Sequence, residues 1–289
     1  MKVNMKLKIL TWNINNTCNI YYDLNELISS QMDENLDLFC ISLQEVCNFE
    51  IKTFKKFYKN SNYKNIELIN SVSISTLIIS KHEFTVKSNH LLFGKFYVNK
   101  GAIISKIKVN EKILIFVNLH LECMDKEVRR RRQQLKFILF HIQKDSRYPI
   151  ILSGDFNFRM HGLRDEGDSF LKKNLFLDEP KKLQNYTYKY INHTRILDNS
   201  RTSSFTDRVL FSGNFVVKEY KTLDNHISDH LPVLSYMELK NSNSLPFIIK
   251  QKYGKYSETS ETFFNYVLYF LILFFGVAMF LLLRFTLME

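Results

Sequence analysis

Short apolar runs alternate with polar stretches from about residue 7 to residue 239. Runs of this length, rich in Ile, Leu, Val and Phe, predict buried β-strands. We expect strands at Leu7–Ile14, Leu36–Leu43, Ser71–Ser80, Ala102–Val109, Ile113–Leu121, Ile150–Ser153, Asp207–Phe211 and Val233–Leu239. Helix-period stretches separate several of these runs, and the alternation is typical of a layered α/β domain.

One helix is predicted from about Met124 to Gln143. Apolar residues recur along one of its faces at Val128, Leu135, Ile138, Leu139 and Ile142. The arginines at 129–132 and Lys136 lie on the other faces, most of which we expect to be solvated. No repeat and no Pro-rich or Gly-rich break divides residues 1–239, so we expect them to form one domain.

Residues 263–283 carry only one strongly polar side chain, that of Asn265. A helix of this length rises about 30 Å, enough to cross the hydrocarbon layer of a bilayer. The pattern therefore predicts a single C-terminal transmembrane helix, joined to the domain by a basic and polar tether at 240–262. A buried helix of the soluble core is the alternative.

Lysines are more frequent before this span than after it, which favours a tail-anchored protein whose domain faces the cytosol. The length of the span and its modest flanking charge favour the endoplasmic reticulum over other membranes.

The composition narrows the classes of function. With 45% hydrophobic residues the chain has ample material for a core, which excludes wholesale disorder. Lys and Arg outnumber Asp and Glu by 40 to 29, and the net charge of +11 favours nucleic acid, phosphorylated small molecules or an acidic membrane as partner. The four cysteines show no CxxC spacing, so they predict neither a zinc site nor a disulfide framework.

Polar side chains follow several of the predicted strands where each strand ends. They are Asn13, Glu45, Asn118, His120, Asp155, Asn157, Asp229 and His230. Taken singly, each residue also fits a turn cap or a solvated side chain. Together they form a set of oxygen and imidazole groups without thiolates, at the sheet ends where α/β proteins bind ligands. Such a set suits Mg²⁺ better than zinc.

Five short motifs occur in the order TWN (11–13), LQE (43–45), NLH (118–120), GDFN (154–157) and SDH (228–230). In this order they resemble the endonuclease/exonuclease/phosphatase superfamily. Three further stretches are similar to the inositol polyphosphate 5-phosphatases of the synaptojanin and OCRL type: NKGA (99–102), YTYKY (186–190) and RTSSFTDRVL (201–210). GDFNFR at 154–159 is similar to that branch as well.

The resemblance implies a four-layer α/β/β/α sandwich of the DNase I-like kind, with the site at one edge. It also implies that Glu45, Asn13 and Asp229 hold or adjoin Mg²⁺. Asp155 would orient and deprotonate the attacking water, with Asn157 fixing the geometry. His230 would contact the phosphoryl oxygens, oriented by Asp207, and His120 and Asn118 would complete the pocket.

Two of these residues have simpler alternatives. Asp207 could pair only with Arg208 or Arg201, and His120 could be a satisfied core histidine.

Substrate contacts implied by the resemblance fall on Lys100, Arg159, Tyr188, Lys189, Arg201 and Arg208. One departure concerns a Lys-x-Arg segment that binds the 4-phosphate in those enzymes, because Asn199 replaces its lysine here. Arg130 and Arg131 match an arginine pair of the family, and one of them is a candidate for supporting the site.

The expected function is Mg²⁺-dependent hydrolysis of the 5-phosphate of membrane phosphoinositides by in-line attack of water. A membrane tether favours lipid substrates, above all phosphatidylinositol 4,5-bisphosphate, and the 3,4,5-trisphosphate stays open. We expect phosphoinositide lipids and a membrane as partners and no nucleic acid; the oligomeric state is left open. Alternatives are a sphingomyelinase-like phosphodiesterase, a nuclease of the same superfamily, or an inactive lipid-binding scaffold.

Overall fold

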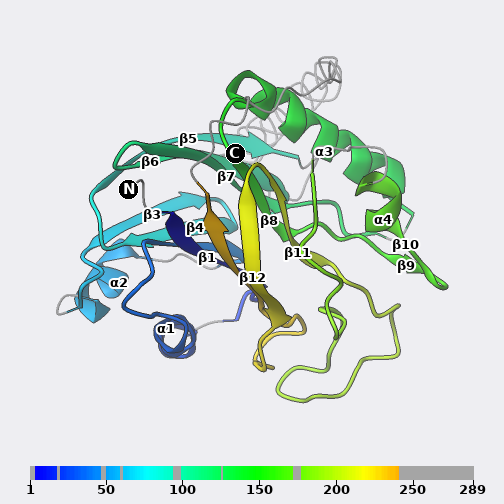
Figure 1. Cartoon of the computed structure of the whole chain (residues 1–289). Coiled ribbons are helices and arrows are strands. Elements are labelled where there is room, and N and C mark those ends of the chain that lie inside the picture. Colours follow the sequence, from blue (N-terminus) through cyan, green and yellow to red (C-terminus); the bar gives the residue numbers. More distant parts are fainter. Residues whose placement is uncertain are drawn as a thin grey trace, which may run out of the picture.

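The computed structural model describes residues 4–17, 20–46, 50–58, 61–93, 99–124, 126–171 and 177–240. Its strands form two large sheets and a short hairpin (Figure 1). The six-stranded sheet has the order β12 (Phe215–Thr222), β13 (Val233–Leu239), β1 (Met5–Asn13), β2 (Leu38–Gln44), β4 (Ile74–Ser80) and β3 (Asn65–Ser71). The five-stranded sheet has the order β11 (Asp207–Ser212), β8 (Ile150–Asp155), β7 (Lys112–His120), β6 (Gly101–Val109) and β5 (Phe84–Leu92).

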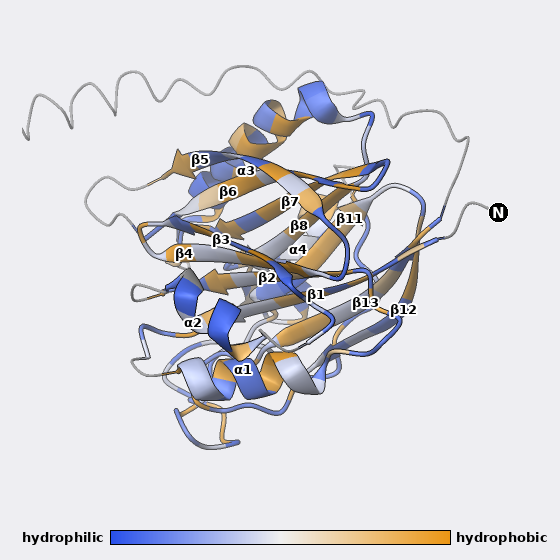
Figure 2. Ribbon diagram, turned by 90° about the vertical axis from the view of Figure 1, so that its left-hand side faces the viewer, coloured by the Kyte–Doolittle hydropathy of each residue, from blue (hydrophilic) through white to orange (hydrophobic). Residues whose placement is uncertain are grey.

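The helices cover the outer faces of the two sheets. They are α1 (Tyr21–Ser30), α2 (Ile51–Phe57), α3 (Val128–Ile142) and α4 (Glu166–Leu171), with a 3₁₀ turn at Gln143–Asp145. Figure 2 shows α3 beside the five-stranded sheet, and α1 and α2 beside the six-stranded sheet. The hairpin β9 (Met160–His161) and β10 (Arg164–Asp165) lies next to α4 (Figure 1). The four layers are those of the predicted α/β/β/α sandwich.

Residue alternation along the strands creates three apolar layers. On β1, Leu7 and Ile9 point between the sheets, whereas Leu10 and Trp12 point toward α1. Ile151 of β8 likewise joins the layer between the sheets, and its two neighbours on the strand pack under α3. Because the central strands are buried on both faces, they appear in the sequence as continuous apolar runs.

Within each sheet, one parallel strand pair brings polar ends to the same edge of the sandwich. Strands β1 and β2 run parallel, with Asn13 opposite Gln44. Strands β7 and β8 also run parallel, with His120 opposite Asp155. Every other pairing in the two sheets is antiparallel, so the starts of β11 and β13 arrive at this edge as well.

The predicted helix begins later than expected. Its first residue is Val128 rather than Met124, and Met124, Lys126 and Glu127 lie outside the helix. The predicted strand at 71–80 is divided by a turn: β3 ends at Ser71, and β4 begins at Ile74.

The predicted transmembrane helix at 263–283 lies outside the residues that the structure describes. Among residues 4–240, as far as they are described, no helix is long and apolar enough to cross a bilayer. The span at 263–283 and the tether at 240–262, apart from its first residue, fall outside the described residues.

Gly154 is required by the close pairing of β8 with β7. Its φ is +151°, and a Cβ added there would lie 2.0 Å from the carbonyl oxygen of Leu119. We expect Gly154→Ala to lower the free energy of unfolding by about 3 kcal/mol, because β8 must move away from β7. Urea denaturation of the full-length protein measures this loss.

Gly162 provides the matched control. Its φ is +60°, but nothing lies within 4 Å of an added Cβ. Gly162→Ala should therefore cost about 1 kcal/mol, for the backbone conformation alone. Equal losses in the two variants would contradict the steric explanation.

Candidate active site

The strand ends at the shared edge bring together residues from both sheets. Asp155 closes β8 and lies opposite Asp207, the first residue of β11. His230 lies three residues before β13, and the carbonyl of its backbone accepts a 3.0 Å hydrogen bond from the indole N–H of Trp12 on β1. Asp155, Asp207 and His230 each offer one ligand atom within 4.8 Å of the others.

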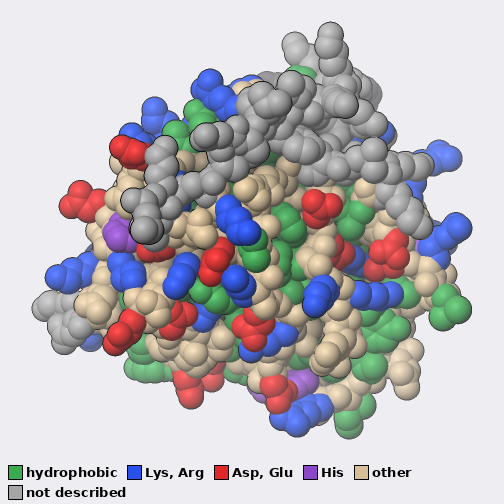
Figure 3. Space-filling view, in the orientation of Figure 1, with side chains coloured by type: hydrophobic (Ala, Val, Ile, Leu, Met, Phe, Trp, Pro, Cys, Tyr) green, Lys and Arg blue, Asp and Glu red, His purple; other side chains and the backbone are tan. Residues whose placement is uncertain are grey.

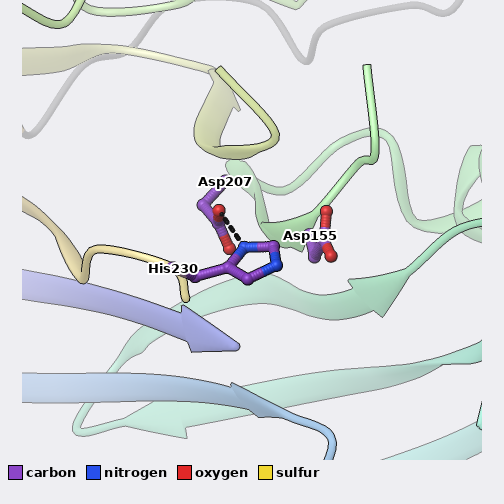
Figure 4. A group of neighbouring side chains, drawn as sticks. All are labelled: Asp155, Asp207 and His230. Carbon is purple, nitrogen blue, oxygen red and sulfur yellow. Dashed lines mark hydrogen bonds and ion pairs between the residues drawn. The ribbon is translucent and has the colours of Figure 1, made fainter. Parts of the chain in front are cut away.

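Asp207 holds the imidazole of His230 (Figure 4). The distance from Nδ1 of His230 to Oδ2 of Asp207 is 2.8 Å, and the hydroxyl of Thr206 donates to the same oxygen at 2.8 Å. Burial disfavours a charged imidazole, but the neighbouring Asp207 carboxylate outweighs burial and raises the pKa of His230 to about 9. His230 is therefore cationic at neutral pH, with Nε2 directed away from Asp207.

Asp155 is a buried carboxylate surrounded by donors. The side chain of Asn13 donates to it at 3.1 Å, and Asn157 donates from its backbone at 2.8 Å and from its side chain at 3.1 Å. Burial would raise the pKa of Asp155, but the hydrogen bond from His120 and the charge of His230 hold it well below its usual range. The carboxylate is thus ionised and fixed in direction.

Glu45 follows β2 with a positive φ of +54°, which turns the chain at the edge of the sheet. Its Oε1 lies 3.7 Å from Nε2 of His120 and 3.9 Å from Nζ of Lys100, too far for hydrogen bonds. About a fifth of the Glu45 side chain is exposed. The same His120 nitrogen lies 3.4 Å from a carboxylate oxygen of Asp155. Glu45, Lys100 and Asp155 therefore form one charged cluster around His120.

The three residues expected to hold a metal carry the donor types that a hard divalent cation prefers. Glu45 and Asp229 supply carboxylates, and Asn13 supplies an amide oxygen. Asp229 lies 4.0 Å from Nε2 of His230 and is largely buried. Oδ1 of Asp207 is also buried, and it has no hydrogen-bond partner within the described structure. The buried group of Asp155, Asp207 and His230 could therefore also hold a metal ion, and both the ion and its ligands stay predictions.

Asn118 and His120 occupy different kinds of position. The side chain of Asn118 donates to the carbonyl of Ser75 at 2.8 Å and accepts from Gln44 at 2.9 Å, which joins β7 to the opposite sheet. This placement favours a structural role over the pocket contact that we expected for Asn118. His120 contacts Lys100 and Asp155, so it belongs to the charged cluster. Burial, together with the charge of Lys100, lowers the pKa of His120.

Arg159 and Tyr188 stack beside the catalytic candidates. The guanidinium of Arg159 lies 4.7 Å from the ring centroid of Tyr188, whose ring lies 4.6 Å from that of His230. Arg159 also donates at 2.8 Å to the side chain of Asn157 and at 2.8 Å to the carbonyl of Cys123. It therefore connects the reaction centre to the loop that follows β7.

The remaining predicted substrate residues divide into two groups. Arg208 is buried, donates to Glu179 at 2.7 Å and pairs closely with Asp165, which favours a structural role over the substrate contact that we expected. Lys189 pairs with Asp198 at 2.9 Å, and Arg201 is exposed.

Two buried residues support the site: Arg131, one of the two arginines expected as candidates for this role, and Glu166, which was not predicted. Arg131, expected on a largely solvated helix face, has no exposed surface and binds Glu166 through two hydrogen bonds of 3.1 and 2.7 Å. Glu166 also pairs with the backbone of Arg159 through bonds of 3.3 and 3.1 Å. The arginine pair shared with the family indicated a supporting role for Arg130 or Arg131. No motif in the sequence indicated such a role for Glu166.

Residues 10–186 match the model of the Endonuclease/Exonuclease/phosphatase family 2. The chain belongs to this family. The resemblance inferred from the motifs is therefore confirmed. Within the family, the chain is 25% identical to type IV inositol polyphosphate 5-phosphatase 11 of Arabidopsis thaliana over 292 residues, which cover 84% of this chain and 85% of that protein.

Solved structures of this family fold carry different functions. The inositol polyphosphate 5-phosphatase domain of SPsynaptojanin, in complex with inositol (1,4)-bisphosphate and a calcium ion, has a TM-score of 0.65 at 18% identity, covering 82% of this chain and 84% of that one. Cimex nitrophorin, a ferrous NO complex, has a TM-score of 0.61 at 16% identity, covering 83% of this chain and all of that one. The fold alone does not decide the activity, so the site residues must.

The Arg131–Glu166 pair gives a stability test. We expect Glu166→Leu to lower the free energy of unfolding by about 3 kcal/mol, because it leaves a buried guanidinium without its carboxylate. Thermal and urea denaturation of the full-length protein measure the change. The double variant Arg131→Met/Glu166→Leu should regain most of that loss, since it removes both charges. A double variant less stable than the single one would contradict this account.

Proposed function

We propose that the chain is a metal-dependent phosphatase that removes the 5-phosphate of membrane phosphoinositides, with phosphatidylinositol 4,5-bisphosphate as the main substrate. The observation that carries the proposal is the buried Asp155, Asp207 and His230 cluster beside Glu45, in a family member similar to a 5-phosphatase along most of its length. The product would be phosphatidylinositol 4-phosphate.

The charges of the cluster suit attack by water on a phosphate ester. Asp155 is ionised and would accept a hydrogen bond, then a proton, from the attacking water, while Asn157 keeps the carboxylate in place. His230 would donate from Nε2 to a phosphoryl oxygen, since Asp207 occupies Nδ1. The water oxygen would bond to phosphorus as the bond between phosphorus and the ring oxygen breaks. The ring oxygen keeps the electron pair and takes up a proton from solvent, which gives inorganic phosphate and a free ring hydroxyl.

A divalent cation bound by Glu45, Asn13 and Asp229 would neutralise charge on the scissile phosphate. Arg159, which stacks on Tyr188 and bonds to Asn157, would bind a phosphoryl oxygen. Lys100, which contacts His120, adds positive charge beside Glu45. These groups act where negative charge builds in the transition state, which is the most effective place for electrostatic stabilisation.

The lipid preference rests on the sequence pattern of residues 263–283. A tail helix that anchors the domain on the cytosolic side of the endoplasmic reticulum would raise the effective concentration of lipid headgroups at the site. The nuclease alternative has weaker support: on the face seen in Figure 3, Lys and Arg side chains are interspersed with Asp and Glu rather than gathered in one patch.

Phosphate release by the full-length protein in non-ionic detergent tests the proposal. The panel contains phosphatidylinositol 4,5-bisphosphate, the 3,4,5-trisphosphate, inositol 1,4,5-trisphosphate, sphingomyelin and plasmid DNA. We expect release from the 4,5-bisphosphate with Mg²⁺, reduced about 10³-fold by Asp155→Ala and about 10²-fold by Asp207→Asn. The control Asp168→Asn changes an exposed carboxylate on α4 and should leave the rate unchanged.

Other outcomes of this panel identify the alternatives. Cleavage of sphingomyelin or nicking of DNA, without phosphate release from inositol lipids, would assign another branch of the family. Binding of the lipids without turnover would indicate an inactive scaffold.

Metal dependence gives a separate prediction. EDTA should abolish phosphate release, and added Mg²⁺ should restore it. Glu45→Gln should raise the Mg²⁺ concentration needed for half-maximal rate about tenfold or more, because the amide removes a negative ligand. A rate that EDTA leaves unchanged, or a Glu45→Gln variant with the wild-type Mg²⁺ requirement, would refute this ligand assignment.

A further inference from the structure

A cavity of about 670 Å³ lies between two loops at the edge of the sandwich. One wall belongs to the loop between β7 and α3, and the other to the long segment between α4 and β11, yellow-green in Figure 1. Its lining residues are Met124, Lys126, Glu127, Asn199, Ser200, Arg201 and Thr202. Two cations and three neutral polar side chains thus face one carboxylate, which favours an anionic ligand.

Both walls connect to the reaction centre through Arg159 and Tyr188. Arg159 donates to the carbonyl of Cys123, the residue before the first wall, and stacks on Tyr188. The second wall is held beside Tyr188, because the backbones of Tyr188 and Ser204, two residues after Thr202, exchange hydrogen bonds of 3.1 and 2.7 Å. Because Tyr188 also stacks on His230, the cavity adjoins the place where the scissile phosphate would bind.

Lys126 and Arg201 are available to a ligand. Within the described part of the chain, neither side chain forms an ion pair or a hydrogen bond, and both are exposed. Lys189, by contrast, is engaged by Asp198 at 2.9 Å. Position 199 offers an amide, Asn199, and therefore no charge.

Three backbone groups on either side of Lys126 are held by hydrogen bonds. Arg131 donates to the carbonyl of Glu122 at 3.2 Å and to that of Met124 at 2.6 Å. The N–H of Glu127 donates to the Met124 carbonyl at 2.9 Å. Because the carbonyls of Glu122 and Met124 and the N–H of Glu127 are held in this way, these residues lose little conformational entropy when a ligand binds, which favours affinity.

We propose that Lys126 is a specificity-determining residue, which together with Arg201 binds the second phosphate of the substrate, next to the scissile 5-phosphate on the inositol ring. Lys126 reaches the cavity from the wall opposite Asn199 and supplies the cation that position 199 lacks. The inference rests on the proposed function for the identity of the reacting phosphate. The second phosphate is a phosphomonoester, carried by a lipid headgroup or by a soluble inositol phosphate.

Kinetics of full-length Lys126→Ala test the proposal. The two lipid substrates are dioctanoyl phosphatidylinositol 4,5-bisphosphate and dioctanoyl phosphatidylinositol 5-phosphate, which differ only in the 4-phosphate. We expect KM for the bisphosphate to rise about five- to tenfold with kcat unchanged, as for the net loss of one solvated hydrogen bond, and KM for the monophosphate to stay the same. Inositol 1,4,5-trisphosphate in parallel shows whether soluble headgroups use the same cavity.

Two further variants separate a local contact from a general loss of charge. Lys136→Ala removes an exposed lysine of α3 and should behave as wild type. Adding Asn199→Lys to Lys126→Ala should restore KM, because it supplies a cation from the opposite wall. Equal KM changes for both lipids, or the same change in Lys136→Ala, would overturn the proposal.

Binding of inositol phosphates that carry no 5-phosphate tests Lys126 separately from the catalytic reaction. Calorimetry should show inositol 1,4-bisphosphate binding about five- to tenfold more weakly to Lys126→Ala than to wild type, with inositol 1-phosphate unaffected. If the wild type released no phosphate from any inositol compound, the proposed function would be refuted. Weaker binding of inositol 1,4-bisphosphate to Lys126→Ala would still show that Lys126 binds the second phosphate. Equal affinity of the two proteins, or no binding of the bisphosphate to wild type, would overturn the role of Lys126.

Discussion

The candidate site exists only if the two sheets keep one fixed position relative to each other. Apolar packing between them is strong but has little direction, so it tolerates small shifts. The buried hydrogen bond from Gln44 to Asn118, and those from Asn118 to β4, are directional and cross from sheet to sheet. They fix the ends of β2 and β7 against each other, and thereby place Glu45 within reach of His120.

The charges at this edge stabilise one another at the expense of solvation. Asp155, Asp207 and His230 are nearly or fully buried, and each depends on its neighbours for hydrogen bonds and opposite charge. Such a cluster serves function rather than stability, because burying apolar residues of similar volume would cost less free energy. The nitrophorin has a similar fold at 16% identity, so the sandwich persists when most of the residues differ.

The sequence predicts the central strands well, because strands buried on both faces are continuous apolar runs. The edge strands β3, β5 and β12 mix polar and apolar residues, and their pattern is too weak to predict them. The carboxylates and His230 at the strand ends were predictable from their motifs. The choice between Arg130 and Arg131, and the surroundings of Arg208 and Asn118, were not. Burial and partners distant in sequence decide whether an arginine or an amide faces solvent, substrate or another side chain.

The pairing of β1 with β13 also orders events during synthesis. Residues 5–11 of the first strand pair with residues 233–239 of the last, and Trp12 bonds to the backbone of His230. A ribosome must therefore release nearly the whole domain before the six-stranded sheet can close. Until then β1 presents an unpaired edge that chaperones can bind. The nascent chain accordingly stays without a working site, and activity begins only after its last strand emerges.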